Sequence, residues 1–321
     1  MVDSPGRITL WGIEVFTAAA DEMSISAAAR RLGASPSSIS QQLSNLEASL
    51  GAKLLNRSAR PVTLTPAGEL FRRRAQTILN EAEQARAELA LEDLSRLTRF
   101  RLGMIEDFDA DVTPALLGDM AQDLSATQFL LETGASHRLF DQLDARALDV
   151  IVAADMGAEA AWMEVHPLME EPFVAAVPRG TLVPNDDILA RLSSMPLIQY
   201  TPRHHMGRQI AAHLVRQNLR LNHRFELDSY HAIMSMVAAG AGWTILTPLG
   251  FLRAHRFRKH AEMIALPFKP MSRRISLIAR REVLGEMPAD VATRIKPLLL
   301  REIVEPCLAQ TPWLIGQLRL L

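Results

Sequence analysis

The stretch Ser24–Glu69, SISAAARRLGASPSSISQQLSNLEASLGAKLLNRSARPVTLTPAGE, decides the fold of the first part of this chain. It predicts short amphipathic helices joined by a tight turn, then a longer helix with a polar face of small residues. A basic turn flanked by β-forming residues follows. This order is typical of a winged helix-turn-helix, so the sequence predicts a module that reads DNA.

Capping residues and a turn glycine set the expected helix boundaries. Apolar residues at helical spacing predict a first helix over Thr9–Asp21. Ser26 is expected to cap a second helix, Ala27–Leu32, and Gly33 to end it. Ser35 is expected to cap the third helix, which has proline at its first position.

The third helix is the expected recognition element, because the N-terminal side chains of such a helix meet base edges in the major groove. Two short strands, Lys53–Leu55 and Val62–Leu64, are expected to flank a basic wing. The residues predicted to bind DNA are Ser35, Pro36, Ser37, Ser38, Ser40, Gln41, Arg57 and Arg60. Of these, Ser37, Ser40 and Gln41 are expected to read bases, and the others to contact phosphates, the minor groove or the helix cap. The alternative is a polar helix face that meets only solvent.

Charge is distributed unevenly along the chain. The formal net charge is -1, but residues 30–74 carry +6 and the remainder -7. The basic residues of that segment are Arg30, Arg31, Lys53, Arg57, Arg60, Arg72, Arg73 and Arg74, and the acidic ones are Glu47 and Glu69. A local basic patch on an otherwise acidic protein is typical of a phosphate-binding module.

A long helix is predicted from Pro66 to about Ser95, rich in Ala, Glu, Arg, Gln and Leu. It has too little apolar surface to form a core of its own. Its apolar stripe suits a partner helix in a dimer, and consists of Leu70, Ile78, Ala82, Ala85 and Leu89.

Beyond Phe100 strand-like and helix-like segments alternate, which predicts a parallel sheet with right-handed crossovers. The pattern repeats after Phe173, and a late strand and helix would let the chain return to the first lobe. We therefore expect a multidomain α+β chain: an N-terminal winged helix-turn-helix, a long linker helix and a C-terminal two-lobed α/β effector domain. The expected boundaries are 1–65 for the DNA-binding domain, 66–97 for the linker, 98–305 for the effector domain and 306–321 for a C-terminal extension. Lobe I is expected over about 98–172 and 270–305, and lobe II over about 173–269.

The chain resembles the LysR-type transcriptional regulators. The specific matches are Ala27–Leu32, Ser35–Ser40, Leu46-Glu47 with Leu50-Gly51, Leu54–Arg57, and Leu64-Thr65 with Ala67-Gly68. Weaker matches at Leu148–Ile151 and Ala239–Pro248 extend the resemblance over the rest of the chain. Members often carry Arg where this chain has Gln41, so no base preference is carried over.

The resemblance implies a bacterial transcription regulator that binds double-stranded DNA as a homodimer assembling to a homotetramer. It also implies two lobes like those of periplasmic binding proteins, with a small-molecule effector between them. Closure of the cleft would change the relative placement of the DNA-binding dimers, a two-state equilibrium that is biased by the different affinities of the effector for the two states.

Ligands in such folds bind at strand carboxyl ends and helix N-termini, which selects the candidate effector residues. They are Asp107, Phe108, Thr133, Ser136, Thr201, Arg203, His204, Asp228 and Tyr230. Each of them has an alternative role as a helix cap or a surface group.

The acidic cluster Glu106, Asp107, Asp109 and Asp111 bears on the effector. If Asp107 faces the cleft, it would repel a simple dianion and favour a polar, zwitterionic or aromatic effector. The alternative is a solvated loop that places favourable acids before a helix.

Other functions find little support in the sequence. It has no G-x-S-x-G, P-loop, Rossmann glycine fingerprint or H-E-x-x-H, so no enzyme and no cofactor are predicted. The histidines lack a metal-ligand spacing, so no metal is predicted. A transporter's solute-binding protein is disfavoured because no signal peptide precedes the DNA-binding module, and no segment is long and apolar enough to span a bilayer. The expected location is the cytoplasm.

One cysteine and an apolar tail complete the sequence. Cys307 stands alone, so no intrachain disulfide is possible, and we expect a small buried apolar side chain rather than a redox sensor. The residues after Glu302 are rich in Ile, Leu, Val and Trp. This tail is expected to pack on its own regulatory domain or on a neighbouring subunit, since large exposed apolar patches invite association.

Overall fold

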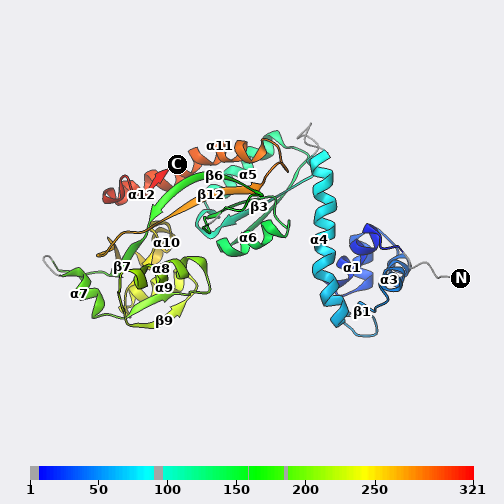
Figure 1. The fold of residues 1–321 in the computed structure, drawn as a ribbon, viewed down its shortest axis with the longest axis horizontal. Coiled ribbons are helices and arrows are strands. Elements are labelled where there is room, and N and C mark those ends of the chain that lie inside the picture. The colour runs from blue at the N-terminus through cyan, green and yellow to red at the C-terminus, as the bar shows by residue number, and fades with distance from the viewer. Residues whose placement is uncertain (1–6, 90–96, 158, 184–186) are drawn as a thin grey trace. The chain divides into compact units, whose positions relative to one another are not determined.

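The structure is a computed structural model that describes residues 7–89, 97–157, 159–183 and 187–321. The chain divides into two compact units, one of residues 1–90 with 145–147 and one of residues 91–144 with 148–321 (Figure 1). The first contains the predicted DNA-binding module and the long helix. The second contains the predicted effector domain.

The first unit has the helices and strands of a winged helix-turn-helix. They are α1 (Leu10–Asp21), α2 (Ile25–Arg31), α3 (Pro36–Leu50), β1 (Leu55–Asn56), β2 (Thr63–Leu64) and α4 (Pro66–Leu89). β1 and β2 pair antiparallel and form the base of the wing. The core lies between the three short helices and the start of α4, where Phe16 packs edge-on against Phe71 with ring centroids 5.2 Å apart.

Two of the three predicted turn signals are confirmed, and one is wrong. Ser35 caps α3 by accepting a hydrogen bond from the Ser38 amide, and Gly33 adopts φ +63° after α2. The cap of α2 is Ser24 rather than Ser26, because the helix begins at Ile25, two residues earlier than expected. Position 26 therefore lies inside the first turn of the helix.

Helix α4 presents two different faces. Ala75 is fully buried against the first unit, whereas Leu70 and Ile78, from the predicted dimer stripe, are exposed by 61% and 38%. The side chain of Leu89 and the expected continuation of the helix through residues 90–96 lie outside the described residues.

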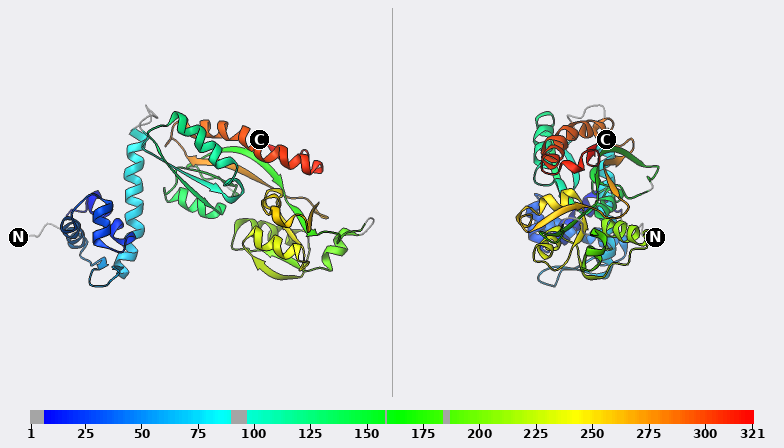
Figure 2. Two further views of the ribbon diagram at one scale, coloured as in Figure 1. Left: turned by 180° about the vertical axis from the view of Figure 1, so that it is seen from behind. Right: turned by 90° about the vertical axis from the view of Figure 1, so that its left-hand side faces the viewer.

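Lobe I of the second unit is built on a six-stranded sheet in the order β13-β6-β12-β5-β3-β4. Its strands are β3 (Arg99–Ile105), β4 (Gln128–Gly134), β5 (Val150–Ala154), β6 (Met163–Pro172), β12 (Ser272–Arg280) and β13 (Arg319–Leu320). Its helices are α5 (Val112–Asp123), α6 (Ser136–Asp144), α11 (Met287–Leu299) and α12 (Glu305–Gln310), with a π-helical turn at Leu300–Val304. Helix α6 lies on one face of the sheet and α5 and α11 on the other (Figures 1 and 2).

Lobe II contains two smaller groups of strands. β10 (Thr244–Leu246), β7 (Val174–Pro178) and β11 (Ala261–Ala265) form an antiparallel sheet, and β8 (Leu197–Tyr200) pairs parallel with β9 (His223–Leu227). A bridge between Leu197 and Trp243 connects the two groups. The helices are α7 (Ile188–Ser193), α8 (His205–Arg216), α9 (Tyr230–Ala238) and α10 (Pro248–Arg253).

The two lobes are joined by two extended crossovers. β6 leads through Phe173 into β7, and β11 returns into β12. β12 runs antiparallel to both β5 and β6, so the expectation of a parallel sheet holds only for β3, β4 and β5. β12 enters lobe I from the side of lobe II, so it runs opposite to β5 and β6.

The basic run Arg253–His260 does not form a single helix. α10 ends at Arg253, and a 3-10 turn over His255–Phe257 follows. Arg253 turns back to pair with Asp109 of lobe I, with 2.7 Å between Nη1 and Oδ1. A charged residue of lobe II therefore connects the lobes.

The apolar tail packs on its own effector domain. β13 pairs antiparallel with β6 at Met169 and Glu170, and the Leu321 amide donates to the carbonyl of Leu168. Leu314 and Leu318 are buried, which confirms the first of the two expectations for this segment. Within the described parts of the chain, no helix is both long and apolar enough to cross a membrane.

Candidate DNA-binding surface and effector cleft

The N-terminal half of α3 presents the polar face on which the DNA-binding prediction rests. Ser37, Ser38 and Gln41 are exposed, while Ile39 and Leu43 on the opposite side are fully buried. Gln41 donates from Nε2 to Oδ1 of Asn45 at 3.0 Å, so its amide is held along the helix surface. The geometry leaves its side-chain oxygen and second amide hydrogen available to a base.

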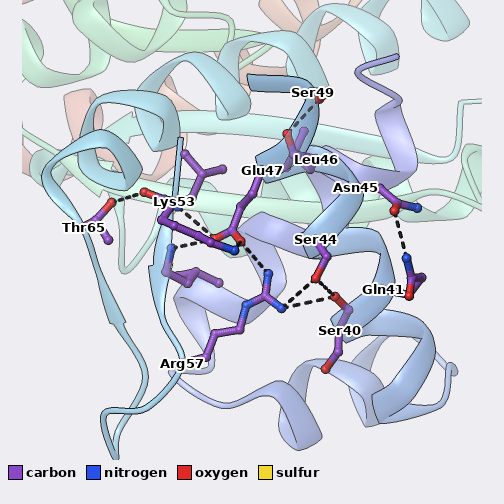
Figure 3. A network of polar contacts seen from close by, with 12 residues as sticks. Ser40, Gln41, Ser44, Asn45, Leu46, Glu47, Ser49, Lys53, Arg57 and Thr65 are labelled. Carbon is purple, nitrogen blue, oxygen red and sulfur yellow. Dashed lines mark hydrogen bonds and ion pairs between the residues drawn. The ribbon is translucent and has the colours of Figure 1, made fainter. Parts of the chain in front are cut away.

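A buried carboxylate fixes the wing to this helix (Figure 3). Glu47 is 3% exposed and accepts hydrogen bonds from the amides of Leu54 and Leu55 at 2.9 and 3.2 Å. Lys53 and Arg57 pair with its second oxygen at 3.1 and 2.8 Å. Burial alone would raise the pKa of Glu47. The hydrogen bonds from the two amides and from Lys53, together with the charge of Arg57, outweigh burial, so the pKa lies below its ordinary value. In the sequence Glu47 was one of two acids in a basic segment and part of a family match, and neither pointed to this structural role.

The two wing arginines lie in different environments. Arg57 donates from Nη1 to the Ser40 carbonyl and the Ser44 hydroxyl in addition to its Glu47 pair, and its side chain is 27% exposed. Arg60 is exposed. Arg57 therefore positions the wing against α3, whereas Arg60 is oriented for an external partner.

A cleft lies between the lobes of the effector domain, at the carboxyl ends of β3, β4 and β8. Four of the nine candidate effector residues line it: Asp107, Ser136, His204 and Tyr230. Glu106, His137, Tyr200, His205 and Arg273 line it with them. The hydroxyl of Ser136 accepts a hydrogen bond from the Ala154 amide at 3.0 Å, which leaves its proton available to a ligand.

The other five candidates lie outside this cavity. Phe108 is fully buried, and Thr201 is buried with its hydroxyl bonded to Glu226 at 2.6 Å. Thr133, Arg203 and Asp228 are exposed. The strand ends lie at the edge of the sheet where this cleft is found, but side-chain direction within each turn decided which residues line it.

The floor of the cleft holds a group of buried charges that sequence reasoning missed. Arg273 donates from Nη2 to Asp107 at 2.8 Å and from Nε to Glu171 at 2.7 Å, and all three side chains are at most 6% exposed. Arg273 is on β12, Glu171 on β6 and Asp107 in the 3-10 turn Glu106–Phe108 after β3. The group therefore ties the end of β6 and the start of β12, where the chain leaves and re-enters lobe I, to the turn after β3. The adjacent charges at Arg273-Arg274 and Glu170-Glu171, each in a strand, were the available signal.

Burial controls protonation in and around the cleft. Desolvation raises the pKa of Glu171 to about 7, with Arg273 opposing and Asp107 assisting the rise. Desolvation also raises the pKa of Glu106, and the Asp107 carboxylate adds to it. Desolvation lowers the pKa of His137, His204 and His205, so the neutral imidazoles are favoured.

Four aromatic rings follow one another along the cleft wall. His137 and His204 lie 5.1 Å apart between ring centroids, His204 and Tyr200 5.8 Å, and Tyr200 and Tyr230 5.6 Å. His137 belongs to lobe I and the others to lobe II, so the row crosses between the lobes. Among the described residues, no group of three or more His, Cys, Asp or Glu side chains is arranged to hold a metal ion.

Comparison with protein families decides the identity of both units. Residues 10–69 match the model described as bacterial regulatory helix-turn-helix protein, lysR family, and residues 95–289 match the LysR substrate binding domain. The chain belongs to the LysR family. It is therefore a DNA-binding transcriptional regulator with an effector-binding domain, as the resemblance in its sequence predicted.

Two relatives of this LysR regulator are named for peroxide response or for OxyR. A probable hydrogen peroxide-inducible genes activator of Mycobacterium xenopi is 33% identical over 180 residues, which are 56% of this chain and 95% of the relative. The DNA-binding transcriptional dual regulator OxyR of Escherichia coli strain K12 is 27% identical over 272 residues, covering 84% of this chain and 88% of OxyR.

Solved structures of full-length regulators share the fold. A cysteine variant of OxyR from Pseudomonas aeruginosa aligns with a TM-score of 0.63 at 23% identity, over 90% of this chain and 95% of that one. CbnR bound to its target DNA aligns with a TM-score of 0.64 at 20% identity, over 91% and 100% of the two chains.

Proposed function

We propose that this LysR-type regulator works in the cytoplasm as a dimer of dimers and changes transcription when a small polar effector occupies the cleft between its lobes. Helix α3 and the wing bind a specific DNA duplex, with Gln41 and Ser37 toward bases and Arg60 toward phosphate. The exposed residues Leu70 and Ile78 of α4 supply a dimer contact.

The observation that carries the effector part of the proposal is the composition of the cleft. Ser136 and His137 from lobe I and Tyr200, His204 and Tyr230 from lobe II face the same cavity. A ligand that contacts both lobes favours the arrangement in which those contacts are made, and this differential affinity shifts the equilibrium. The Arg253–Asp109 pair already connects the lobes, so a ligand acts on a linked system.

DNA binding is tested by a mobility shift with the intergenic DNA upstream of the protein's own gene and a random duplex of equal length. Wild-type protein is expected to shift the first at a lower concentration than the second at moderate salt. Arg60→Ala is expected to weaken binding to both, because a phosphate contact carries no sequence information. Arg220→Ala, an exposed arginine of lobe II, is the charge-matched control.

Two results of this experiment would contradict the proposed DNA binding. If Arg60→Ala and Arg220→Ala bind both duplexes as the wild type does, the wing does not contact phosphate. Affinity that does not fall between low and moderate salt contradicts the whole DNA-binding assignment, since neutralised phosphates release counterions.

A second candidate is a regulator that responds to peroxide, which the names of the relatives favour. Cys307 is the single cysteine, so an intrachain disulfide cannot form. Its side chain is fully buried, and burial raises the pKa of its thiol. A protonated, inaccessible thiol reacts slowly, because the thiolate is the nucleophile. Peroxide is therefore expected to leave DNA binding unchanged in wild type and in Cys307→Ala, and a peroxide effect present only in the wild type would favour this second candidate.

A further inference from the structure

We propose that the effector is a small protonated amine whose nitrogen lies between Glu106 and Asp107 and whose carbon skeleton lies along the Tyr200–Tyr230 wall. The inference rests on the proposed role of this cleft as the effector site and specifies the chemical class of its ligand.

The first observation is an acceptor without a donor. Asp107 is 3% exposed, and its Oδ2 is taken by Arg273, but Oδ1 accepts no hydrogen bond from any described residue. A buried carboxylate oxygen without a partner is costly, and such groups mark sites where a ligand supplies the missing donor. Asp107 lines the cavity, so this oxygen selects a ligand that donates.

The second observation concerns the only buried cation among the residues that line the cavity. Arg273 is flanked by two carboxylates, those of Asp107 and Glu171, so the three ionised groups together carry a net negative charge. Protonation of Glu171 makes the group neutral, not positive. Because Glu106 adds a further carboxylate at the rim, the floor of the cleft repels an anion and attracts a cation.

The third observation is the aromatic wall. Tyr200 and Tyr230 are 8% exposed each, lie 5.6 Å apart and line the same cavity as the two carboxylates. Burial raises the pKa of both phenols, which therefore stay protonated. Electron-rich ring faces beside carboxylates form the environment that binds an ammonium group by cation–π and charge attraction.

The remaining charges near the cleft do not reverse this preference. The imidazoles of His137, His204 and His205 are held neutral by burial. Arg253, which is half-buried and acts on Glu106, is neutralised by its pair with Asp109. Arg138, Arg203 and Arg208 are exposed, so solvent screens them more strongly than the buried groups. They lie outside the cavity lining, where they would meet only a distal part of a ligand.

The cleft also limits the size of the ligand. Its cavity volume is about 60 Å³ in this structure, enough for a few water molecules or an aminomethyl group. A larger skeleton requires the lobes to separate. An amine held at Glu106 and Asp107 would therefore bias the spacing of the lobes.

The test measures thermal stabilisation of the full-length protein by matched small molecules. The cations are benzylamine, butylamine and tetramethylammonium, with benzyl alcohol and benzoate as the neutral and anionic partners of benzylamine. At least one cation is expected to raise Tm in a concentration-dependent manner, since a ligand that binds only the folded state stabilises it. Benzyl alcohol and benzoate are expected to give smaller shifts at the same concentration.

Variants of two residues that line the cleft test where the amine nitrogen binds. Glu106→Gln is expected to weaken binding of the active cation by about tenfold or more, because it removes a charge-assisted hydrogen bond. Tyr200→Phe removes only a hydroxyl that donates to the Asp228 carbonyl, so it keeps the ring and is expected to preserve binding. Glu132→Gln, an exposed carboxylate of lobe I outside the cavity lining, is the charge-matched control.

The results separate this inference from the proposed function. Stabilisation by benzoate but not by cations, equal stabilisation by all three benzyl compounds, or no stabilisation by any cation would overturn the amine assignment while leaving the DNA-binding test intact. Stabilisation by a cation that persists unchanged in Glu106→Gln would place the nitrogen away from Glu106 and would overturn this inference, while the proposed role of the cleft as the effector site would stand.

Discussion

Glu47 makes four interactions from a position with almost no solvent exposure. It accepts from two backbone amides and pairs with Lys53 and Arg57, so one side chain holds the wing against the recognition helix. A residue to which the sequence analysis assigned no structural role is thus a support for the DNA-binding surface. Its neighbours in sequence gave no sign of this, because its partners are six to ten residues further along the chain.

Replacement of Glu47 should therefore destabilise the N-terminal unit. Glu47→Ala leaves two buried amides without an acceptor and Arg57 without its pair, and is expected to cost about 3 kcal/mol of unfolding free energy. Calorimetry of the full chain would report it as a lower transition temperature for that unit. The exposed Glu69→Ala is the control, and equal effects of the two substitutions would contradict the support role.

Gln41 should influence sequence choice more than overall affinity. Gln41→Ala removes a group able to pair with adenine, which is worth about 1–3 kcal/mol of discrimination. Competition of specific against random duplex in a mobility shift would measure the change in preference. A uniform loss on both duplexes would instead assign Gln41 to the helix surface, where it bonds Asn45.

The raised pKa of Glu171 gives the effector domain a pH-dependent stability. The folded pKa of about 7 exceeds the ordinary value of 4.5, so the stability that this group contributes is fully present below about pH 4.5 and is lost as pH rises toward 7. Glu171→Gln cannot ionise and should flatten this part of the profile. Thermal unfolding between pH 5 and 8 checks the slope, and a mutant profile parallel to the wild type would show that another group is responsible.

Among the elements, uninterrupted strand-like segments were predicted and interrupted ones were not. The strand-like pattern expected after Phe173 is confirmed by the strands Leu197–Tyr200 and Thr244–Leu246. β6 was missed because prolines and glutamates break its pattern. Pro167 lies at an irregularity in the pairing with β12, where a missing amide is tolerated. The sequence around Pro167 does not reveal that the pairing with β12 is irregular at that point.

The tail is the element whose role the sequence left open between two neighbours. Leu314→Ala removes a fully buried side chain and is expected to cost about 2–4 kcal/mol, whereas Ile315→Ala, 69% exposed, should change stability little. Thermal unfolding of both variants distinguishes them. If Ile315→Ala were the more damaging, the exposed face of the tail would be buried by another subunit.

At the scale of the whole molecule, fold and family were accessible from the sequence, but the cleft chemistry was not. The sequence left open whether Asp107 faces the cleft or lies in a solvated loop, and in the structure it is buried and paired with Arg273 from a strand 166 residues away. Such long-range pairing depends on how the crossover strands return to lobe I. Neither periodicity nor capping signals contain that information.

Thermodynamic linkage between the effector cleft and the DNA-binding surface leads to a prediction for the whole molecule. If an amine such as benzylamine changes the affinity for the operator by some factor, operator DNA must change the affinity for that amine by the same factor. Titrations of each ligand in the presence and absence of the other measure both factors. Unequal factors at equilibrium would mean that the assembly state changes between the two experiments.

The solitary, buried thiol of Cys307 has a practical consequence for watching this molecule move. Because it reacts slowly, cysteines introduced by Arg138→Cys in lobe I and Arg220→Cys in lobe II can be labelled selectively with a pair of fluorophores or spin labels. Removal of the background thiol then needs a single substitution, Cys307→Ala. The spacing of the lobes thus becomes directly visible in solution by energy transfer or electron paramagnetic resonance, one molecule at a time if required.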